Sequence, residues 1–494
     1  MRGVARYIGT CLVVLALGLT GAAYGESVAF VTHEVTGAGD PVPVDLEVQR
    51  LSLDGTVGWL TGAGPQAVAK TPERELAPVA CPDGSGGVIV IYARETVSGE
   101  RQGDSDVLAQ RFDNAGRPVW NDGGEPIRIA ASAQREGRPV ALSDGSGGAF
   151  VVFEWTGPNG DTDLLGQRIS AHGNLLWAGG QPVPIAASEY PEHSPVLVSD
   201  GENGLFVVFQ WDGPEQDSDI MAQRLTRRGQ LLWNYGEQAV DVAASGHAER
   251  RPAAVAGTAG ELLVFFELEY LSGDRKGNVD VAAQRVSGWG ETLWALGDPL
   301  MVGATDAWEG GPVAVSDGAG GGVVVFSTRP MNAGEEANAD LLTQRMAPSG
   351  KPLWGEGNPV PLEATPERAG RALGLATSDG GAIWVYELGA GGGDVNIVAQ
   401  RLDANGQPVW NGGQSPVVVA ASGWLEHLEQ VVPDGAGGAI VLLTATSTEE
   451  ATRGDTDVGA VRLAAEGTLP WPQMAVVAGG PSLQGKPCLT IVSK

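Results

Sequence analysis

The chain has few basic side chains for its length. Its 494 residues include 31 Lys and Arg against 60 Asp and Glu, and the formal net charge is -29 at pH 7. A body this acidic repels nucleic-acid backbones and anionic membrane surfaces. We therefore expect no nucleic-acid partner, and we expect ligands that are neutral or cationic.

Cysteine is also scarce, and no two cysteines are adjacent. Cys11 lies in the apolar N-terminal segment, so only Cys81 and Cys488 remain further along the chain. This excludes zinc sites built from closely spaced cysteines. Two cysteines in an oxidising compartment either pair or stay as buried thiols, and the sequence leaves both outcomes open.

Long apolar runs are missing beyond the N-terminus, and no segment shows sustained helical periodicity. The first 25 residues resemble a secretory signal, with Arg2 and Arg6, an apolar run at 11–19 and small residues at 23–25. We expect 1–25 to be a signal peptide and 26–494 a single domain. The product is then exported to the periplasm or outside the cell, with no membrane insertion after signal removal.

One phrase recurs eight times: an Arg, a Gly five residues later, and a Trp four residues after that. The Arg-to-Trp spacing is nine in every copy, whereas the copies lie 56 to 61 residues apart. A motif with constant internal spacing, whose copies are separated by segments of variable length, is typical of a repeat architecture. We expect the phrase to be structural, with each Trp between neighbouring repeats. These Trp residues are Trp59, Trp120, Trp177, Trp233, Trp294, Trp354, Trp410 and Trp471.

Each repeat contains four strand-like segments, and the second of them is apolar at nearly every position. Such a segment predicts a strand buried on both faces. We expect an all-β fold, an eight-bladed β-propeller of four-stranded antiparallel blades, because β-solenoid repeats are usually shorter. Segment 28–34 resembles a second strand with no first strand before it, and 486–492 resembles a first strand. The C-terminal strand is therefore expected to complete the first blade and close the ring.

The phrase resembles the tryptophan-docking repeat of quinoprotein-type (PQQ-like) propellers. Copy seven, RLDANGQPVW, has Asp403, Gly406 and Trp410 with the Gly-to-Trp spacing of that family. Its Asp-to-Gly spacing is one residue shorter, and the Thr of the family is missing. The resemblance implies eight blades with a Trp packed between each pair. It also implies that non-catalytic exported propellers of unassigned function are closer analogues than the dehydrogenases, which often carry a vicinal cysteine pair.

The loops before the third segment of each repeat are acidic, and several carry an Asp-x-Asp pair. These oxygens suit calcium, the one cofactor we consider, or they form Asx-type turns that start a strand. His193 and His247 lie in consecutive loops. Together with the nearby carboxylates they would bind a transition metal or act in acid–base catalysis; the alternative is that they are isolated surface residues. The candidate metal-binding residues are Asp104, Asp106, Asp161, Asp163, Asp217, Asp219, His193 and His247.

The loops before the first segment place a Glu at a recurring position, which predicts a partial ring of carboxylates around one channel mouth. Local hydrogen bonding to loop amides is the alternative. Aromatic residues in the same loops would stack on a sugar or a peptide. The candidate ligand-binding residues are Tyr190, Trp308, Trp424, Glu136, Glu192, Glu249, Glu309 and Glu426.

No catalytic constellation stands out in the sequence, so we assign no catalytic residue. We expect a monomeric, exported binding or scaffold protein that uses the loop face for a protein or glycan ligand. The alternative is a propeller enzyme, either a polysaccharide hydrolase or lyase or a divergent quinoprotein dehydrogenase.

Overall fold

The computed structural model describes residues 14–17, 28–36, 44–62, 64–214, 217–258, 260–331, 339–363, 367–390, 394–448 and 456–478. Over these residues the chain is all β, and its helical segments are 3₁₀ turns of three or four residues. These turns are η1 (Trp120–Gly123), η2 (Ala178–Gly180), η4 (Trp233–Gly236), η5 (Ala295–Gly297), η6 (Gly355–Gly357) and η7 (Trp410–Gly413). In these ranges no helix has the length and apolarity needed to cross a membrane.

Four kinds of strand, here called a, b, c and d, recur in that order along the chain. The a strands are β1 (Val14–Leu17), β5 (Arg74–Pro82), β9 (Arg135–Ser143), β13 (Glu192–Ser199), β17 (Ala248–Ala256), β21 (Trp308–Ser316), β25 (Arg368–Ala376) and β29 (Leu425–Pro433). The b strands are β2 (Val28–Thr36), β6 (Val88–Glu95), β10 (Ala149–Thr156), β14 (Leu205–Asp212), β18 (Leu262–Glu269), β22 (Gly322–Arg329), β26 (Ala382–Ala390) and β30 (Ala439–Thr446).

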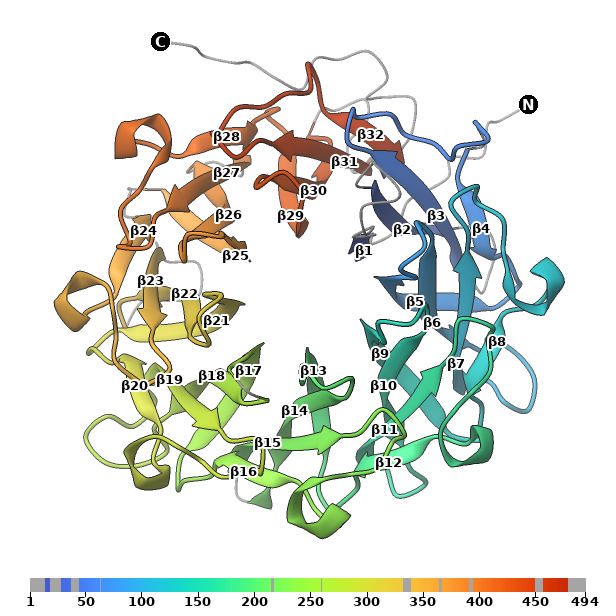
Figure 1. Ribbon diagram of the computed structural model, residues 1–494, viewed down its shortest axis with the longest axis horizontal. Helices are drawn as coiled ribbons and strands as arrows, with labels where there is room; N and C mark the ends of the chain where they lie inside the picture. The colour runs from blue at the N-terminus through green and yellow to red at the C-terminus, as the bar shows by residue number, and fades with distance from the viewer. Residues whose placement is uncertain are drawn as a thin grey trace.

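The remaining strands lie further from the centre of the molecule (Figure 1). The c strands are β3 (Val44–Ser52), β7 (Ser105–Phe112), β11 (Thr162–Ile169), β15 (Ser218–Leu225), β19 (Val279–Val286), β23 (Asp340–Met346), β27 (Asp394–Leu402) and β31 (Thr456–Leu463). The d strands are β4 (Gln66–Ala69), β8 (Ile127–Ala130), β12 (Val183–Ala186), β16 (Val240–Ala243), β20 (Leu300–Gly303), β24 (Val360–Glu363), β28 (Val417–Ala420) and β32 (Ala475–Ala478).

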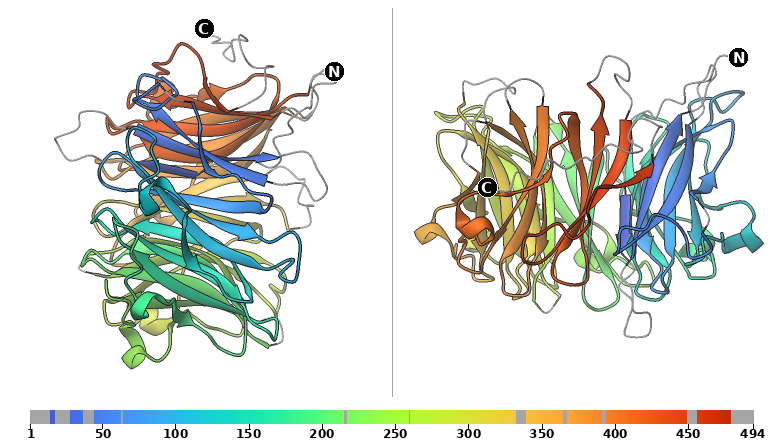
Figure 2. Two further views of the ribbon diagram at one scale, coloured as in Figure 1. Left: turned by 90° about the vertical axis from the view of Figure 1, so that its right-hand side faces the viewer. Right: turned by 90° about the horizontal axis from the view of Figure 1, so that it is seen from above.

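Within each a-b-c-d group, which we call a repeat and number from the N-terminus, neighbouring strands pair antiparallel. Figure 1 shows the groups placed around a common centre, with a strands inside and d strands outside. The side views of Figure 2 show a short, wide body. The fold is therefore all-β and propeller-like.

Single parallel bridges join the start of a c strand to the start of the next a strand. The partners are Val44 with Arg74, Ser105 with Arg135, Ser218 with Ala248, and Val395 with Leu425. Since the register is the same each time, loop residues at equivalent sequence positions meet at every such junction. These junctions hold most of the acidic residues singled out by the sequence.

The b strands are buried on both faces, as their sequence predicts. In β10, for example, Val151, Val152 and Phe153 are fully buried. In β11 the small residue Gly166 lets the paired strand β12 of the same repeat approach closely. A Cβ added at Gly166 would lie only 2.7 Å from Cδ1 of Ile185, so a larger side chain there would displace the neighbouring strand.

Each Trp of the repeated Arg–Gly–Trp motif contacts the c–d turn of the following repeat. The Nε1 of Trp177 donates to the carbonyl oxygen of Arg227 at 3.0 Å, and the indole packs under Gly229, whose φ of +78° is a left-handed conformation that favours glycine. The same donation links Trp120 to Ala171, Trp233 to Gly288, Trp294 to Pro348, Trp354 to Ala404, Trp410 to Ala465 and Trp471 to Leu53. The last of these joins repeat 8 to repeat 1.

The innermost strand of repeat 1 differs from the sequence-based expectation. Strand β1, inside the predicted signal peptide, pairs antiparallel with β2 through Val14 with Thr32 and Leu17 with Ala29. It also lies beside β5 and β29. The edge of β2 needs a hydrogen-bonding partner, and in the full-length chain this apolar N-terminal segment supplies it. The segment 486–492, which we expected there, lies outside the described residues, as does Cys488, whereas Cys81 is a buried free thiol.

The inter-repeat Trp contact makes a direct prediction. Trp177→Ala should lower the free energy of unfolding by about 3–5 kcal/mol, because it leaves a cavity and removes one of the two hydrogen bonds that the Arg227 carbonyl oxygen accepts. Trp289→Ala is the matched control, since that side chain is 87% exposed. Chemical denaturation of both variants measures the difference, and equal stability of the two would contradict the role assigned to Trp177.

Candidate functional site

The recurring Glu residues lie at the start of the a strands and are buried. Glu192 is 2% exposed, and Glu249 and Glu309 are fully covered. Each accepts hydrogen bonds from a Ser or Thr four residues earlier. Ser245, for example, donates its hydroxyl to Glu249 at 2.5 Å. Glu136 and Glu426 are also buried and are held in the same way by Ser132 and Ser422. These carboxyl groups therefore close their own loops instead of facing solvent as a ring.

Burial changes the acidity of these groups. It raises the pKa of Glu192 and Glu249 to about 7, against the opposing effect of the hydrogen bonds from their Ser partners. Burial and the charge of Asp217 likewise raise the pKa of Asp219 to about 7. Asp219 lies within hydrogen-bonding reach of Glu249, so this pair can share a proton near neutral pH.

The Asp-x-Asp residues fall into two groups. Arg101 reaches both Asp104 and Asp106, with its Nε 2.6 Å from Asp104 Oδ2 and its Nη2 2.8 Å from Asp106 Oδ1. Arg128 adds a contact of 3.0 Å to Asp106. A guanidinium therefore already neutralises this pair. In the pairs Asp161–Asp163 and Asp217–Asp219, no salt bridge occurs among the described residues.

The structure does not bring the candidate histidines together with these carboxylates. The Nε2 of His193 lies 2.8 Å from Asp212 Oδ2, while the ring of His247 packs on Tyr270 with centroids 5.0 Å apart. Across the described ranges, no group of three or more His, Cys, Asp or Glu residues is close enough to hold a metal ion. Calcium binding by the Asp-x-Asp pairs stays a prediction.

The three candidate aromatic residues have different surroundings. Tyr190 is 37% exposed and meets Trp211 edge to face, with ring centroids 5.2 Å apart. Trp308 is partly buried under the guanidinium of Arg329, 4.2 Å from the ring centroid. Trp424 is buried in an apolar cluster and has no free face to offer a ligand. Tyr190 does not itself line a cavity, but the ring it contacts, Trp211, does.

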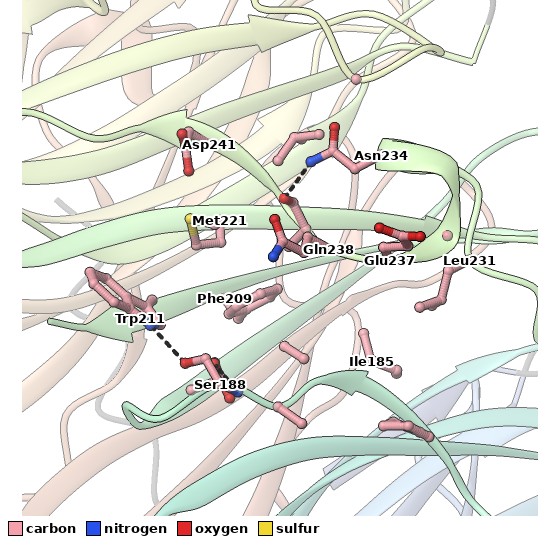
Figure 3. A pocket seen from close by; sticks show the side chains of 18 of the residues that line it. Ile185, Ser188, Phe209, Trp211, Met221, Leu231, Asn234, Glu237, Gln238 and Asp241 are labelled. Carbon is pink, nitrogen blue, oxygen red and sulfur yellow. Dashed lines mark hydrogen bonds between the residues drawn. The ribbon is translucent and has the colours of Figure 1, made fainter.

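That cavity has a volume of about 1020 Å³ and crosses repeat 4 from β12 toward the c–d turn of repeat 5. Figure 3 shows Phe209 and Trp211 of β14 beside Met221 of β15, with Gln238 near the middle and Asn234 toward the other end. The Nε1 of Trp211 donates to Ser188 Oγ at 3.0 Å, which fixes the indole plane.

Polar groups surround the apolar part of the cavity. Gln238 lines it from the segment leading into β16 and Asp241 from β16 itself, and Glu192 borders it beside Ser188. Apart from Glu192, sequence reasoning did not identify this site. The available signal was Trp211 at the end of a b strand, but Trp155 holds the same position in repeat 3 and does not line the cavity. Sequence position alone could not separate the two.

Comparison with known proteins adds little to this description. No protein-family model and no curated protein matches the sequence. Among solved structures, an ulvan lyase of polysaccharide lyase family PL25 is 10% identical, with a TM-score of 0.44 over 81% of this chain and 96% of its own. Polysaccharide lyase Uly1 is 11% identical, with a TM-score of 0.45 over 82% and 92%.

An α-L-arabinofuranosidase from Lactobacillus brevis is also similar, at 11% identity and a TM-score of 0.30 over 59% of this chain and 97% of its own. At such identities and TM-scores the likeness transfers neither a substrate nor a reaction to this chain.

The raised carboxyl pKa values predict how stability depends on pH. A carboxyl that holds its proton more tightly when folded contributes stability below its unfolded pKa of about 4.5, and this is lost as pH rises toward 7. Glu249→Gln should reduce the downward slope of unfolding free energy in that window by up to about 1.4 kcal/mol per pH unit. Glu100→Gln, at an exposed position, is the control. Chemical denaturation from pH 4.5 to 7.5, in buffer that contains a metal chelator, measures the unfolding free energy of each variant. The same pH slope in Glu249→Gln as in wild type would contradict the prediction.

Proposed function

We propose that the protein is an exported eight-bladed β-propeller of four-stranded, tryptophan-docking blades that binds a carbohydrate in the cavity of repeat 4. The observation that carries the proposal is the cavity itself, where a fixed indole and polar side chains line a volume of about 1020 Å³. Small-molecule sites of roughly 300–1,000 Å³ combine apolar walls with a few placed polar groups. A sugar ring offers both an apolar face and hydroxyl groups to match.

The arrangement of the cavity suits a ligand with two kinds of surface. Trp211 is held by its bond to Ser188 and by Tyr190, so little side-chain freedom is lost when a ligand stacks on it. Gln238 and Asp241 can accept hydroxyl hydrogen bonds at the polar side.

The charge of the molecule narrows the ligand class. The chain carries a formal net charge of -29, and Asp241 and Glu237 line the cavity. Sulfated or uronic-acid polysaccharides would be repelled by this field. The ligand expected on this basis is a neutral or amino-bearing oligosaccharide.

Glycan cleavage is the second candidate function, because Glu192 borders the cavity and burial raises its pKa to about 7. A carboxyl group protonated near neutral pH is suited to act as a general acid. Its Oε1 is bound by the Ser188 amide and its Oε2 is covered, which favours a structural role in the unliganded protein. Binding without cleavage is therefore the first candidate.

The proposal predicts that Trp211→Ala weakens oligosaccharide binding by about tenfold or more, equivalent to 1.4 kcal/mol. Trp155→Ala is the matched control, because Trp155 makes the same type of bond, to Ser132 Oγ at 3.3 Å, and does not line the cavity. Glycan-array screening of the full chain identifies a neutral or amino sugar, and calorimetry then compares the variants.

If Trp211→Ala keeps the wild-type affinity for the oligosaccharide, or if Trp155→Ala loses as much affinity as Trp211→Ala, then this cavity is not the binding site. Release of reducing ends from the bound glycan by wild type, abolished in Glu192→Gln with binding intact, would establish the enzymatic candidate instead.

A further inference from the structure

An arginine of the chain fills the junction between repeats 5 and 6. The Nη1 of Arg275 lies 2.7 Å from Asp280 Oδ2, and its Nη2 lies 2.7 Å from Asp280 Oδ1 and 2.6 Å from the Thr305 carbonyl oxygen. Asn278 also donates to Thr305 O at 2.9 Å. Glu309 of β21 completes the set beside Asp280. Asp280 and the Thr305 carbonyl thus hold the positive charge of Arg275, and Asn278 and Glu309 lie beside them.

The junction between repeats 2 and 3 is filled in the same way. Arg101 stands three residues before Asp104, as Arg275 stands three before Asn278. Besides both aspartates, its Nη2 contacts the carbonyl oxygen of Ser132 at 2.5 Å, the counterpart of Thr305. The spacing Arg-x-x-Asp/Asn-x-Asp therefore places a guanidinium at one position in two separate junctions.

The junction between repeats 7 and 8 has the same donor set without the arginine. Asp394 and Asn396 flank Val395, which bridges to Leu425 directly before Glu426, so the register equals that of Ser105 with Arg135. The residue three before Asp394 is Gly391, which has no side chain to fill the position. In the described part of the chain, no Arg or Lys forms an ion pair with Asp394 or Glu426.

Three oxygens at this junction are buried without a partner. They are Oδ1 of Asp394, Oδ1 of Asn396 and Oε2 of Glu426, and the Glu426 side chain is only 1% exposed. A buried polar atom without a hydrogen bond costs about 1–3 kcal/mol, more if it is charged. Three such atoms occur here, at the position that a guanidinium fills between repeats 2 and 3 and between repeats 5 and 6.

We propose that a calcium ion binds at the junction between repeats 7 and 8, with Asp394, Asn396 and Glu426 as protein ligands. All three ligands are hard oxygens from carboxylate or amide groups, which suit calcium, and water completes its coordination of six to eight oxygens. The two carboxylates balance its charge. The ion does here what Arg275 does between repeats 5 and 6, and the proposal is independent of the carbohydrate function.

The test uses the full chain, stripped with chelator and titrated with calcium chloride in a calorimeter at pH 7.5. Wild type should bind calcium and melt at a higher temperature when it is present. Glu426→Gln and Asp394→Asn should each weaken this site by about 10- to 100-fold or more, lowering the stoichiometry by one ion per chain. Asn396→Asp should tighten it by adding a charged ligand. Asp104→Asn, at the junction filled by Arg101, should leave calcium binding unchanged.

A complementary variant tests the equivalence of guanidinium and ion. Arg275→Gln empties the junction between repeats 5 and 6 and should add one calcium ion per chain. Absence of calcium binding by stripped wild type would overturn the proposal, as would an unchanged stoichiometry in both Glu426→Gln and Asp394→Asn. If those two variants do not fold, Asn396→Asp still decides, since unchanged affinity there counts against Asn396 as a ligand.

Discussion

In six of the c–d turns one backbone carbonyl receives two hydrogen bonds from the preceding repeat, one from a Trp and one from an Arg, and the rest of the molecule depends on this joint. The carbonyl of Ala171 accepts from Trp120 Nε1 at 3.0 Å and from Arg111 Nη1 at 2.8 Å. Arg111 also binds Asp83 in the a–b turn of its own repeat. The joint therefore connects both turns of one repeat to the next. Trp471 and Arg462 repeat it onto Leu53 and so join the last repeat to the first.

Because this joint sets how closely repeats approach, it also determines the surroundings of the acidic loops at the junctions. Their charge is handled in three ways. Arg101 and Arg275 neutralise two junctions from within the chain. At Glu249 a buried carboxyl group is bound by Ser245 and has a pKa raised to about 7. At Glu426 an oxygen remains without a partner, and there we propose that an external cation restores the balance.

Several elements could be predicted from local pattern. The continuous apolar b strands are buried on both faces, and the small residue Gly166 lies where β12 of the same repeat approaches closely. The loop carboxylates could be predicted only in part. Their four-residue spacing from a Ser or Thr, such as Ser132 to Glu136, can be recognised in the sequence, but whether each carboxyl group is buried cannot. The cavity could not be predicted at all. Trp155 and Trp211 occupy the same position in two repeats, and only the packing around Trp211 leaves space beside it.

The sequence alone determined the period, the order of the four strands and the position of each Trp, since these depend on residues within about one repeat and recur eight times. The tertiary structure decided which carboxyl groups are buried, which junctions already contain a cation, and that β1 covers the edge of β2. The physical reason is distance along the chain. Solvent access and charge balance at a junction depend on side chains from two repeats, and no local pattern specifies how those side chains meet.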